Sequence, residues 1–235
     1  MGDGIADLRI APSSVDAAAL MAKGRMLADL DGSSEMSLRE ALVSLASMFG
    51  IPVAARRGDP LVATLQPTES KHARRRSLSG TFSLGAFPCH VDTAHWVVPC
   101  RYVLLACLDP GIGNRETVLL DTRSLPLTDQ QRELLYCSPL RIMNGSQSFF
   151  STILHRRRAF VRYDPGCMRP VSSEGQLALN IFDSSTWPAL TTRIRWRRGR
   201  VLVIDNWRVL HGRGEAACED GQRTLMRVYV NGESE

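Results

Sequence analysis

The 235-residue sequence has little of what would mark it as a secreted, membrane-spanning or zinc-stapled protein. No two of its six cysteines have the C-x-x-C spacing of a zinc ribbon. No apolar run reaches the roughly 18 residues that span a membrane, and the start, MGDGIADLRIAPSS, lacks the basic and apolar regions of a secretory signal. We therefore expect a cytoplasmic protein with no membrane partner and with reduced thiols at Cys89, Cys100, Cys107, Cys137, Cys167 and Cys218.

Positive charge is in modest excess, with a formal net charge of +5. It concentrates in two runs, KHARRR at Lys71–Arg76 and RIRWRRGR at Arg193–Arg200. Nucleic-acid-binding surfaces carry such runs, but no helix-turn-helix, zinc finger or aromatic stacking platform accompanies these. A solvated loop and the edge of a strand also explain these runs. A basic entrance to a binding site would in addition suit a carboxylated small molecule. We expect a small-molecule substrate rather than nucleic acid, and the sequence leaves a homo-oligomer open.

The composition predicts one globular domain over residues 1–235, with 44% hydrophobic and 23% charged residues. Its N-terminal part, about residues 1–50, is predicted to be helical. One helix is expected within Ser13–Gly32 and another within Ser34–Gly50. In the second, Ser37 is the expected N-cap, because Glu40 follows three residues later as in a capping box, and Gly50 is the expected stop.

From about residue 81 to residue 235 the pattern changes to short apolar runs separated by turn residues. This spacing favours an all-β sandwich or barrel over alternating βα units. One helix is expected in Leu127–Pro139, with Thr128 as its N-cap. The architecture predicted is mainly β, with the N-terminal helices packed outside. Candidate strands are Trp96–Leu108, Glu116–Thr122, Ala159–Asp164, Leu177–Phe182, Thr192–Trp196, Arg200–Asn206 and Thr224–Val230.

A histidine and an aspartate stand two residues apart in the strand-like run FPCHVDTAHW. Side chains alternate across a strand, so His90 and Asp92 are expected on the same face. Their meeting point could hold a metal ion, a proton relay or an ordinary buried hydrogen bond. His211, in DNWRVLHGR, is a second candidate ligand. Two histidines and one carboxylate on a β-scaffold make the facial triad of non-haem Fe(II) oxygenases.

The flanking residues narrow these alternatives. Asp205-Asn206-Trp207-Arg208 and the Leu210–Arg213 run, with HVD at 90–92, resemble the taurine dioxygenase family of Fe(II)/2-oxoglutarate oxygenases, most closely its γ-butyrobetaine hydroxylase branch. Thr117 stands twenty-five residues after Asp92, and Arg223 twelve residues after His211, where the family places 2-oxoglutarate ligands. The family often has Gly-Gly-x-Thr before this threonine, whereas here it is Asn114-Arg115-Glu116-Thr117.

The resemblance implies a double-stranded β-helix, the jelly-roll or cupin-like fold, and a set of cofactors. Fe(II) would be held by His90, Asp92 and His211. Thr117 and Arg223 would hold 2-oxoglutarate as co-substrate, and O₂ would be the oxidant. The implied reaction is hydroxylation or desaturation of a small amino-acid-like or carboxylated metabolite, with release of succinate and CO₂.

Four further residues are candidates for contact with the primary substrate. Arg227 follows Arg223 by four residues on the same strand face, and it could meet either the substrate or a structural carboxylate. His95 and Trp96 follow the HVD run closely and could line the substrate side or simply pack. Arg162 lies in the run FVRYDPG, where members of the family often have a pocket-facing arginine.

Three other functions remain open at this stage. A catalytically silent member of the fold could bind a ligand or a partner protein. A zinc hydrolase could use the same three ligands, although it leaves Thr117 and Arg223 without a role. A nucleic-acid demethylase would account for the basic runs.

Overall fold

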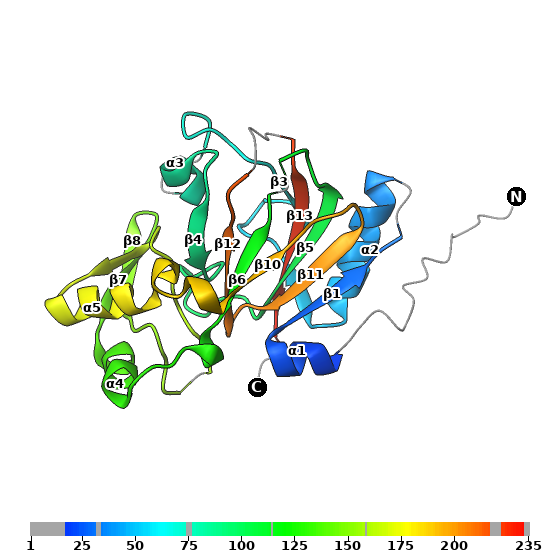
Figure 1. The fold of residues 1–235 in the computed structure, drawn as a ribbon. Helices are drawn as coiled ribbons and strands as arrows, with labels where there is room; N and C mark the ends of the chain where they lie inside the picture. The colour runs from blue at the N-terminus through cyan, green and yellow to red at the C-terminus, as the bar shows by residue number, and fades with distance from the viewer. Residues whose placement is uncertain are drawn as a thin grey trace, which may run out of the picture.

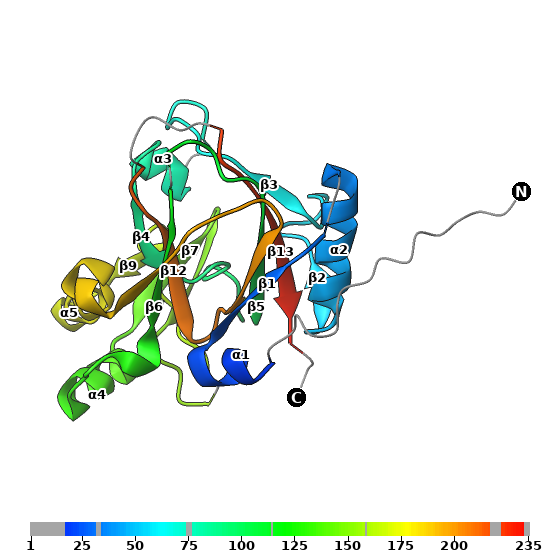
Figure 2. The same ribbon diagram turned by 45° about the vertical axis from the view of Figure 1, so that its right-hand side comes forward.

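Two antiparallel β-sheets stack face to face at the centre of the molecule (Figures 1 and 2). The computed structural model describes residues 17–31, 34–73, 77–113, 115–157, 159–216 and 222–232. The main sheet has the order β1-β11-β5-β13-β2, and β3 also pairs with β13. Its strands are β1 (Arg25–Asp29), β11 (Arg200–Asp205), β5 (Tyr102–Asp109), β13 (Thr224–Asn231), β2 (Ile51–Val53) and β3 (Ala63–Leu65). The second sheet contains, in order, β10 (Thr191–Ile194), β6 (Thr117–Asp121), β12 (Val209–Arg213) and β4 (Phe87–His90).

The space between the two sheets is filled by apolar side chains from alternate strand positions. On β11, Leu202 and Ile204 point into this space, whereas Val201 and Val203 belong to the core on the opposite face. The second sheet contributes Leu119 among others. Each fully buried side chain of this kind stabilises the fold by about 1.5–3 kcal/mol relative to its exposed state. The inner layer therefore sets a rigid frame for the polar residues that also face inward.

Helices and a third sheet cover the outer faces (Figure 2). The helices α1 (Ala17–Lys23) and α2 (Glu35–Ser47) pack on the main sheet. The second sheet packs against α4 (Asp129–Cys137), α5 (Ser173–Phe182) and the sheet β8-β7-β9 (Gln147–Ser151, Leu140–Asn144, Met168–Pro170). A short helix α3 (Leu78–Phe82) precedes β4, and 3₁₀ turns occupy Thr122–Ser124, Ser184–Thr186 and Pro188–Leu190.

The prediction of one helix across Ser13–Gly32 is wrong in its second half. The helix α1 ends at Lys23, and Arg25–Asp29 forms β1, paired antiparallel with β11. Gly24 separates the two elements with φ +65°, and a Cβ there would lie 2.6 Å from Val209 Cγ2. The N-terminal part, about residues 1–50, is thus not only helical, because it also contains β1, which joins the main sheet. Residues 13–16 and 32 lie outside the described residues.

The expected N-cap of α2 is also wrong by one turn. Ser34 caps the helix, and Ser37 is its N3 residue rather than its N-cap. The Ser34 hydroxyl accepts from the Ser37 backbone N–H at 3.1 Å, while Ser37 Oγ accepts from the Ser34 N–H at 3.1 Å. Two serines spaced three apart satisfy each other, so Glu40 is not needed for the capping box.

The predicted strand Leu177–Phe182 is part of the helix α5. Ser172 caps this helix, and the buried positions Ala178 and Phe182 are four residues apart, which is helical spacing. Of Ala159–Asp164, only Val161 forms a bridge, with Leu154. The strand expected from Trp96 begins at Tyr102. The predicted helix with Thr128 as N-cap is confirmed, and its capping partner is Gln131.

No helix in the described ranges combines the length and the apolar character that crossing a membrane requires. The five cysteines within those ranges are free thiols, in agreement with the expectation, and Cys218 lies outside them.

Candidate metal centre

The two predicted histidine ligands stand opposite each other on neighbouring strands. His90 is the last residue of β4, His211 is the middle residue of β12, and the two are register partners. Their ring centroids are 4.8 Å apart. Gly212 permits this close approach, because a Cβ there would lie 2.7 Å from the Phe87 carbonyl oxygen on β4. The strand pairing alone therefore brings both imidazoles to one point.

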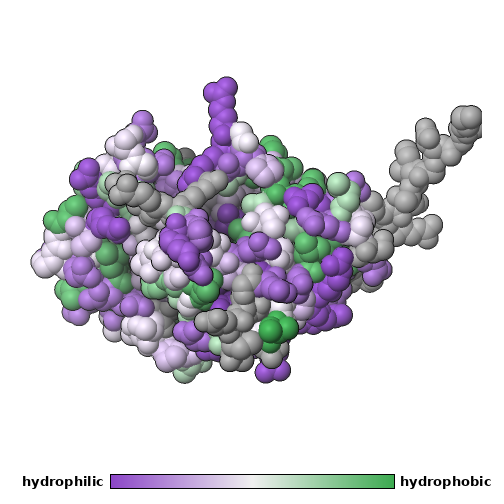
Figure 3. All heavy atoms as spheres, turned by 90° about the horizontal axis from the view of Figure 1, so that it is seen from above, coloured by the Kyte–Doolittle hydropathy of each residue, from purple (hydrophilic) through white to green (hydrophobic). Residues whose placement is uncertain are grey.

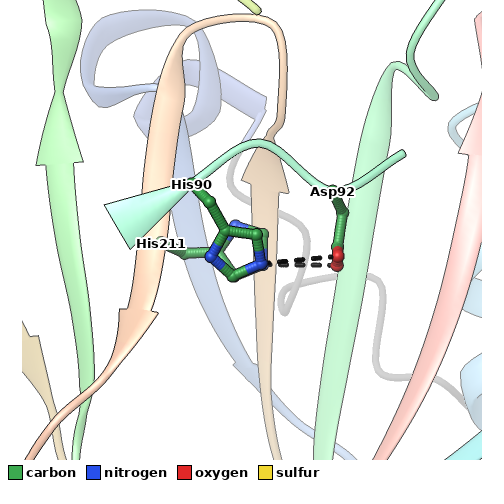
Figure 4. Close-up of side chains that lie close together, drawn as sticks. All are labelled: His90, Asp92 and His211. Carbon is green, nitrogen blue, oxygen red and sulfur yellow. Dashed lines mark ion pairs between the residues drawn. The ribbon is translucent and has the colours of Figure 1, made fainter. Parts of the chain in front are cut away.

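Asp92 reaches the same point from a turn rather than from the strand. The strand β4 ends at His90, so the predicted shared strand face does not exist, although the two side chains still converge (Figure 4). One Asp92 oxygen lies 3.6 Å from His90 Nε2, and the other lies 3.3 Å from His211 Nε2. One potential ligand atom from each residue lies within 4.8 Å of the others, and all three residues are buried.

Hydrogen bonding orients the His90 ring toward this meeting point. His90 Nδ1 lies 3.2 Å from the Pro88 carbonyl oxygen. A carbonyl only accepts, so Nδ1 carries the proton in the neutral ring and Nε2 presents its lone pair. A histidine that binds a metal through one ring nitrogen usually donates a hydrogen bond from the other, as Nδ1 does here.

The electrostatics favour an ionised carboxylate between the imidazoles. Burial raises the pKa of Asp92, but the charge of Arg227 and the contacts from both histidines outweigh it and hold this pKa well below its ordinary value. Arg227 NH1 lies 3.3 Å from Asp92 Oδ2. Burial also lowers the pKa of His211, whereas Asp92 outweighs burial at His90 and raises the pKa of that ring.

Asn206 fixes the backbone of the turn that carries Asp92. Its side-chain oxygen accepts from the Asp92 N–H at 3.0 Å, and its amide donates to the Asp92 carbonyl at 3.0 Å and to the Cys100 carbonyl at 2.9 Å. Asn206 is fully buried. In the same turn Thr93 has φ +58°, and its hydroxyl accepts from the Cys100 N–H at 2.8 Å. In the sequence, Asn206 appears only within the Asp205–Arg208 motif, and no local pattern assigns it a role.

We predict that Asn206→Ala lowers both the stability of the protein and its affinity for divalent metal. The substitution leaves three buried backbone groups without partners, and each such group costs about 1–3 kcal/mol. The free energy of unfolding should fall by about 3 kcal/mol or more, as measured by urea denaturation, and Co(II) should bind more weakly to the folded variant. Asn180→Ala, on the exposed face of α5, is the matched control and should change the free energy of unfolding by about 0.5 kcal/mol or less. Unchanged Co(II) affinity in Asn206→Ala would contradict this positioning role.

The predicted co-substrate residues gather at one end of the sandwich. Thr117 begins β6, is buried, and accepts a hydrogen bond from Trp196 Nε1 at 3.1 Å. Arg223 precedes β13, is buried, and donates from NH1 to the Arg115 carbonyl at 3.2 Å. The register pairs Thr117 with Arg213, two residues along β12 from His211. At about 3.3 Å per residue, this places Thr117 about 7 Å further along the sheet than the histidine.

The candidate substrate residues differ in where they lie. Arg227 contacts Asp92, and its guanidinium lies 4.4 Å from the centre of the Tyr229 ring. Of the two partners expected for Arg227, the structure provides a carboxylate, that of the candidate ligand itself. His95 and Trp96 are half-buried in the turn after Asp92, with their rings edge to face at 6.4 Å. Trp96 also packs edge to face against Tyr229 at 6.1 Å. These contacts do not test a role in substrate binding, which stays a prediction.

Arg162 is almost completely buried and donates mainly to backbone. Its guanidinium donates to the carbonyls of Ala94, of Trp96 at 2.7 Å and of Val97 at 2.8 Å, and Nε donates to Ser151 Oγ at 3.2 Å. It therefore holds the turn that carries His95 and Trp96, and its predicted contact with substrate stays untested.

The second basic run is largely tied to neighbouring groups. Arg195 lies 3.1 Å and Arg193 3.6 Å from the carboxylate of Glu116, and Arg197 lies 2.7 Å from that of Asp29. In the first run, residues 74–76 lie outside the described residues. Seen from above, the surface is mainly hydrophilic and is hollowed near its middle (Figure 3). The ion pairs of Arg193, Arg195 and Arg197 agree with a solvated face at Arg193–Arg200.

The donor set at the centre fits an Fe(II) ion. Two imidazoles and one carboxylate converge, which is the ligand set that non-haem Fe(II) oxygenases use. The described residues supply no thiolate to this cluster, which argues against a structural zinc site. The observation that carries the fit is the convergence of three buried ligand atoms on one point.

A family model matches the C-terminal part of the chain. Residues 145–229 match the family described as "Taurine catabolism dioxygenase TauD, TfdA family", which confirms the predicted resemblance, whereas the γ-butyrobetaine hydroxylase branch stays a prediction. The match contains His211, Arg223 and Arg227, whereas His90, Asp92 and Thr117 precede it. No curated protein sequence matches the chain.

Several solved structures share the fold, among them two oxygenases in complex with iron. Asparagine oxygenase in complex with Fe(II), 2S,3S-3-hydroxyasparagine and succinate is 18% identical with a TM-score of 0.76, over 91% of this chain and 77% of that one. The non-haem iron oxygenase OrfP in complex with Fe and α-ketoglutaric acid is 18% identical with a TM-score of 0.69, and the match covers 90% of this chain and 76% of that one. PvcB from Pseudomonas aeruginosa is 19% identical with a TM-score of 0.66, and the match covers 92% of this chain and 78% of that one. The predicted jelly-roll fold is confirmed.

Proposed function

We propose that this chain, which matches the TauD/TfdA family over residues 145–229 and has the fold of non-haem iron oxygenases, is an Fe(II)/2-oxoglutarate-dependent oxygenase. It hydroxylates or desaturates a small amino-acid-like or carboxylated metabolite. We further propose that residues 1–235 act as a single domain. The observation that carries the proposal is the convergence of His90, Asp92 and His211 on one buried point.

The three convergent residues fit the role of metal ligands. When bound there, Fe(II) would couple the oxidative decarboxylation of 2-oxoglutarate by O₂ to oxidation of the substrate, with release of succinate and CO₂. Asp92 stays ionised at neutral pH because its pKa is held well below the ordinary value. Its negative charge would offset part of the metal charge, and the two imidazoles would supply neutral nitrogen ligands.

The cationic end of the sandwich fits the distal carboxylate of the co-substrate. Arg223 offers a planar fork that can bind a carboxylate with two hydrogen bonds, and Thr117 offers a hydroxyl on the facing sheet. The offset of about 7 Å between the levels of His211 and Thr117 suits a five-carbon dicarboxylate whose other end reaches the metal. The apolar inner layer keeps water away from the centre between them.

The substrate end of the site is expected on the other side of the metal centre. Arg227, His95 and Trp96 are the proposed substrate-lining residues, and Arg162 holds the turn that carries two of them. A cationic residue here suits a carboxylated substrate. The asparagine oxygenase and OrfP structures contain hydroxylated asparagine and hydroxylated arginine, which supports free amino acids as the first substrates to test.

The experiment is succinate formation from 2-oxoglutarate in the presence of Fe(II) and ascorbate, across a panel of amino acids and carboxylated metabolites. Succinate above the uncoupled background, together with a product 16 or −2 mass units from one panel member, would support the proposal. Two outcomes oppose it. A catalytically silent protein would form no succinate with Fe(II) loaded, and a hydrolase would turn over with Zn(II) in the absence of O₂.

A further inference from the structure

Arg115 is a buried cation that the family motifs do not explain. It stands two residues before Thr117, at 4% exposure. In the part of the chain that the structure describes, its side chain donates a long hydrogen bond from NH1 to the Gly214 carbonyl at 3.3 Å. Its Nε is buried without a hydrogen-bond partner. Among these residues no carboxylate forms an ion pair with it.

The buried guanidinium of Arg115 needs an anionic partner. A guanidinium stays protonated in proteins, so burial cannot be relieved by loss of its proton as it can for a lysine. A buried charge that is neither paired nor fully hydrogen-bonded costs several kcal/mol. The neighbouring Glu116 does not supply the anion, because its carboxylate lies with the exposed Arg193 and Arg195 at 3.6 and 3.1 Å.

The position of Arg115 shows which anion it can reach. The strand β6 begins, β12 ends and β13 begins at the same end of the sandwich, as the pairing registers and Figure 1 show. The Arg223 guanidinium donates to the carbonyl of Arg115 itself at 3.2 Å. Arg213, the register partner of Thr117, is also buried here, but its donors go to the carbonyls of Gly85 at 2.8 Å and of Ser83. Arg115 is thus the buried cation beside Arg223 that keeps donor capacity to spare.

We propose that Arg115 is a second co-substrate-binding residue, which holds the distal carboxylate of the 2-oxo acid together with Arg223. The inference rests on the proposed function and deepens it. A guanidinium of Arg115 beside that of Arg223 would make the site selective for 2-oxo dicarboxylates over 2-oxo monocarboxylates, because a monocarboxylate gives the buried charge of Arg115 no anionic partner.

The test compares two ligands on one metal-loaded protein. 2-Oxoglutarate and 2-oxopentanoate share the chelating end and differ in the distal carboxylate. Their dissociation constants are measured without O₂, from the charge-transfer absorption that each chelate gives with Fe(II). Arg115→Gln should weaken 2-oxoglutarate binding about tenfold to a hundredfold, as expected for loss of a hydrogen bond to a charged group. Binding of 2-oxopentanoate should change by less than about threefold.

Three variants keep the result interpretable. Arg195→Gln removes an exposed guanidinium from the same region and should leave both dissociation constants unchanged. Arg115→Lys keeps the positive charge but lacks the planar guanidinium, so it should recover part of the affinity for 2-oxoglutarate. The same variant replaces Arg115→Gln in the test if Arg115→Gln fails to fold. Arg223→Ala should also lose the preference for the dicarboxylate.

The outcomes separate this proposal from the function on which it rests. If wild-type protein binds neither 2-oxo acid with Fe(II), the proposed function fails and the role of Arg115 fails with it. If the wild type prefers 2-oxoglutarate and Arg115→Gln or Arg115→Lys keeps that preference in full, the oxygenase function stands and the role of Arg115 is overturned. An equal loss for both ligands would also overturn it, because that pattern indicates a purely structural role.

Discussion

Replacing His211 with alanine is expected to abolish measurable Fe(II) binding and turnover, and His90→Ala is expected to do the same. Each substitution removes one of the three protein ligands that converge within 4.8 Å. Loss of a residue that merely supports a ligand already costs about 10–100-fold in metal affinity, so loss of a ligand should cost more than about 100-fold. The fold should survive, because Arg227 still pairs with the buried Asp92 carboxylate in either variant.

The measurement is an anaerobic equilibrium titration with Fe(II), followed by the succinate assay at stoichiometric iron. His72→Ala is the matched control, because His72 is exposed and distant in sequence from the three ligands; it should bind and turn over as the wild type does. Full activity in either ligand variant at one equivalent of iron would refute the assignment.

Arg223→Ala is expected to produce the second largest effect, on the affinity for 2-oxoglutarate. Truncating one partner of a buried charge pair costs about 2–5 kcal/mol, because the other charge is left unpaired. This corresponds to a loss of roughly thirtyfold to several-thousandfold in affinity, at about 1.4 kcal/mol per factor of ten. Arg223→Lys should recover only part of it, since an ammonium lacks the planar fork. The measurement is the apparent affinity for 2-oxoglutarate in the uncoupled succinate reaction.

Arg227→Ala provides the comparison, because Arg227 lies in β13 whereas Arg223 immediately precedes that strand. Arg227 contacts Asp92 at 3.3 Å rather than the Thr117 end of the sandwich, so its loss should leave the 2-oxoglutarate affinity within severalfold of the wild type. The effect is expected on metal binding or on the primary substrate instead. If Arg227→Ala shows the large loss and Arg223→Ala does not, the two roles must be exchanged.

The candidate site could be predicted largely because its chemistry is local in sequence. His90 and Asp92 are two residues apart, and the DNWRVLHGR run carries His211 with its flanks. Strand alternation predicts that the His90 and Asp92 side chains converge, and they do, but Asp92 lies in a turn that Asn206 holds from 114 residues away rather than in a strand. A hydrogen bond across that separation leaves no periodic signal in the sequence. Arg115 was noted as a departure from a motif, but its burial becomes evident only in three dimensions.

The fold was predicted in class but not in several elements, for related reasons. The residues of β1 include Met26, Leu27 and Ala28, which favour helices as much as strands, and only pairing with β11 decides between the two. The run Leu177–Phe182 is apolar at both helical and extended spacing, and the cap at Ser172 selects the helix. A distant strand thus decides the structure of β1, whereas a cap just upstream of the apolar run decides that of α5.

The most direct test of the central claim uses ¹⁸O₂ with protein loaded with Fe(II) or with Zn(II). If His90, Asp92 and His211 hold an oxygenase iron, Fe(II)-loaded protein should convert 2-oxoglutarate to succinate that carries one ¹⁸O atom, and Zn(II)-loaded protein should form none. Succinate without ¹⁸O, or product formation with Zn(II) in the absence of O₂, would contradict the account.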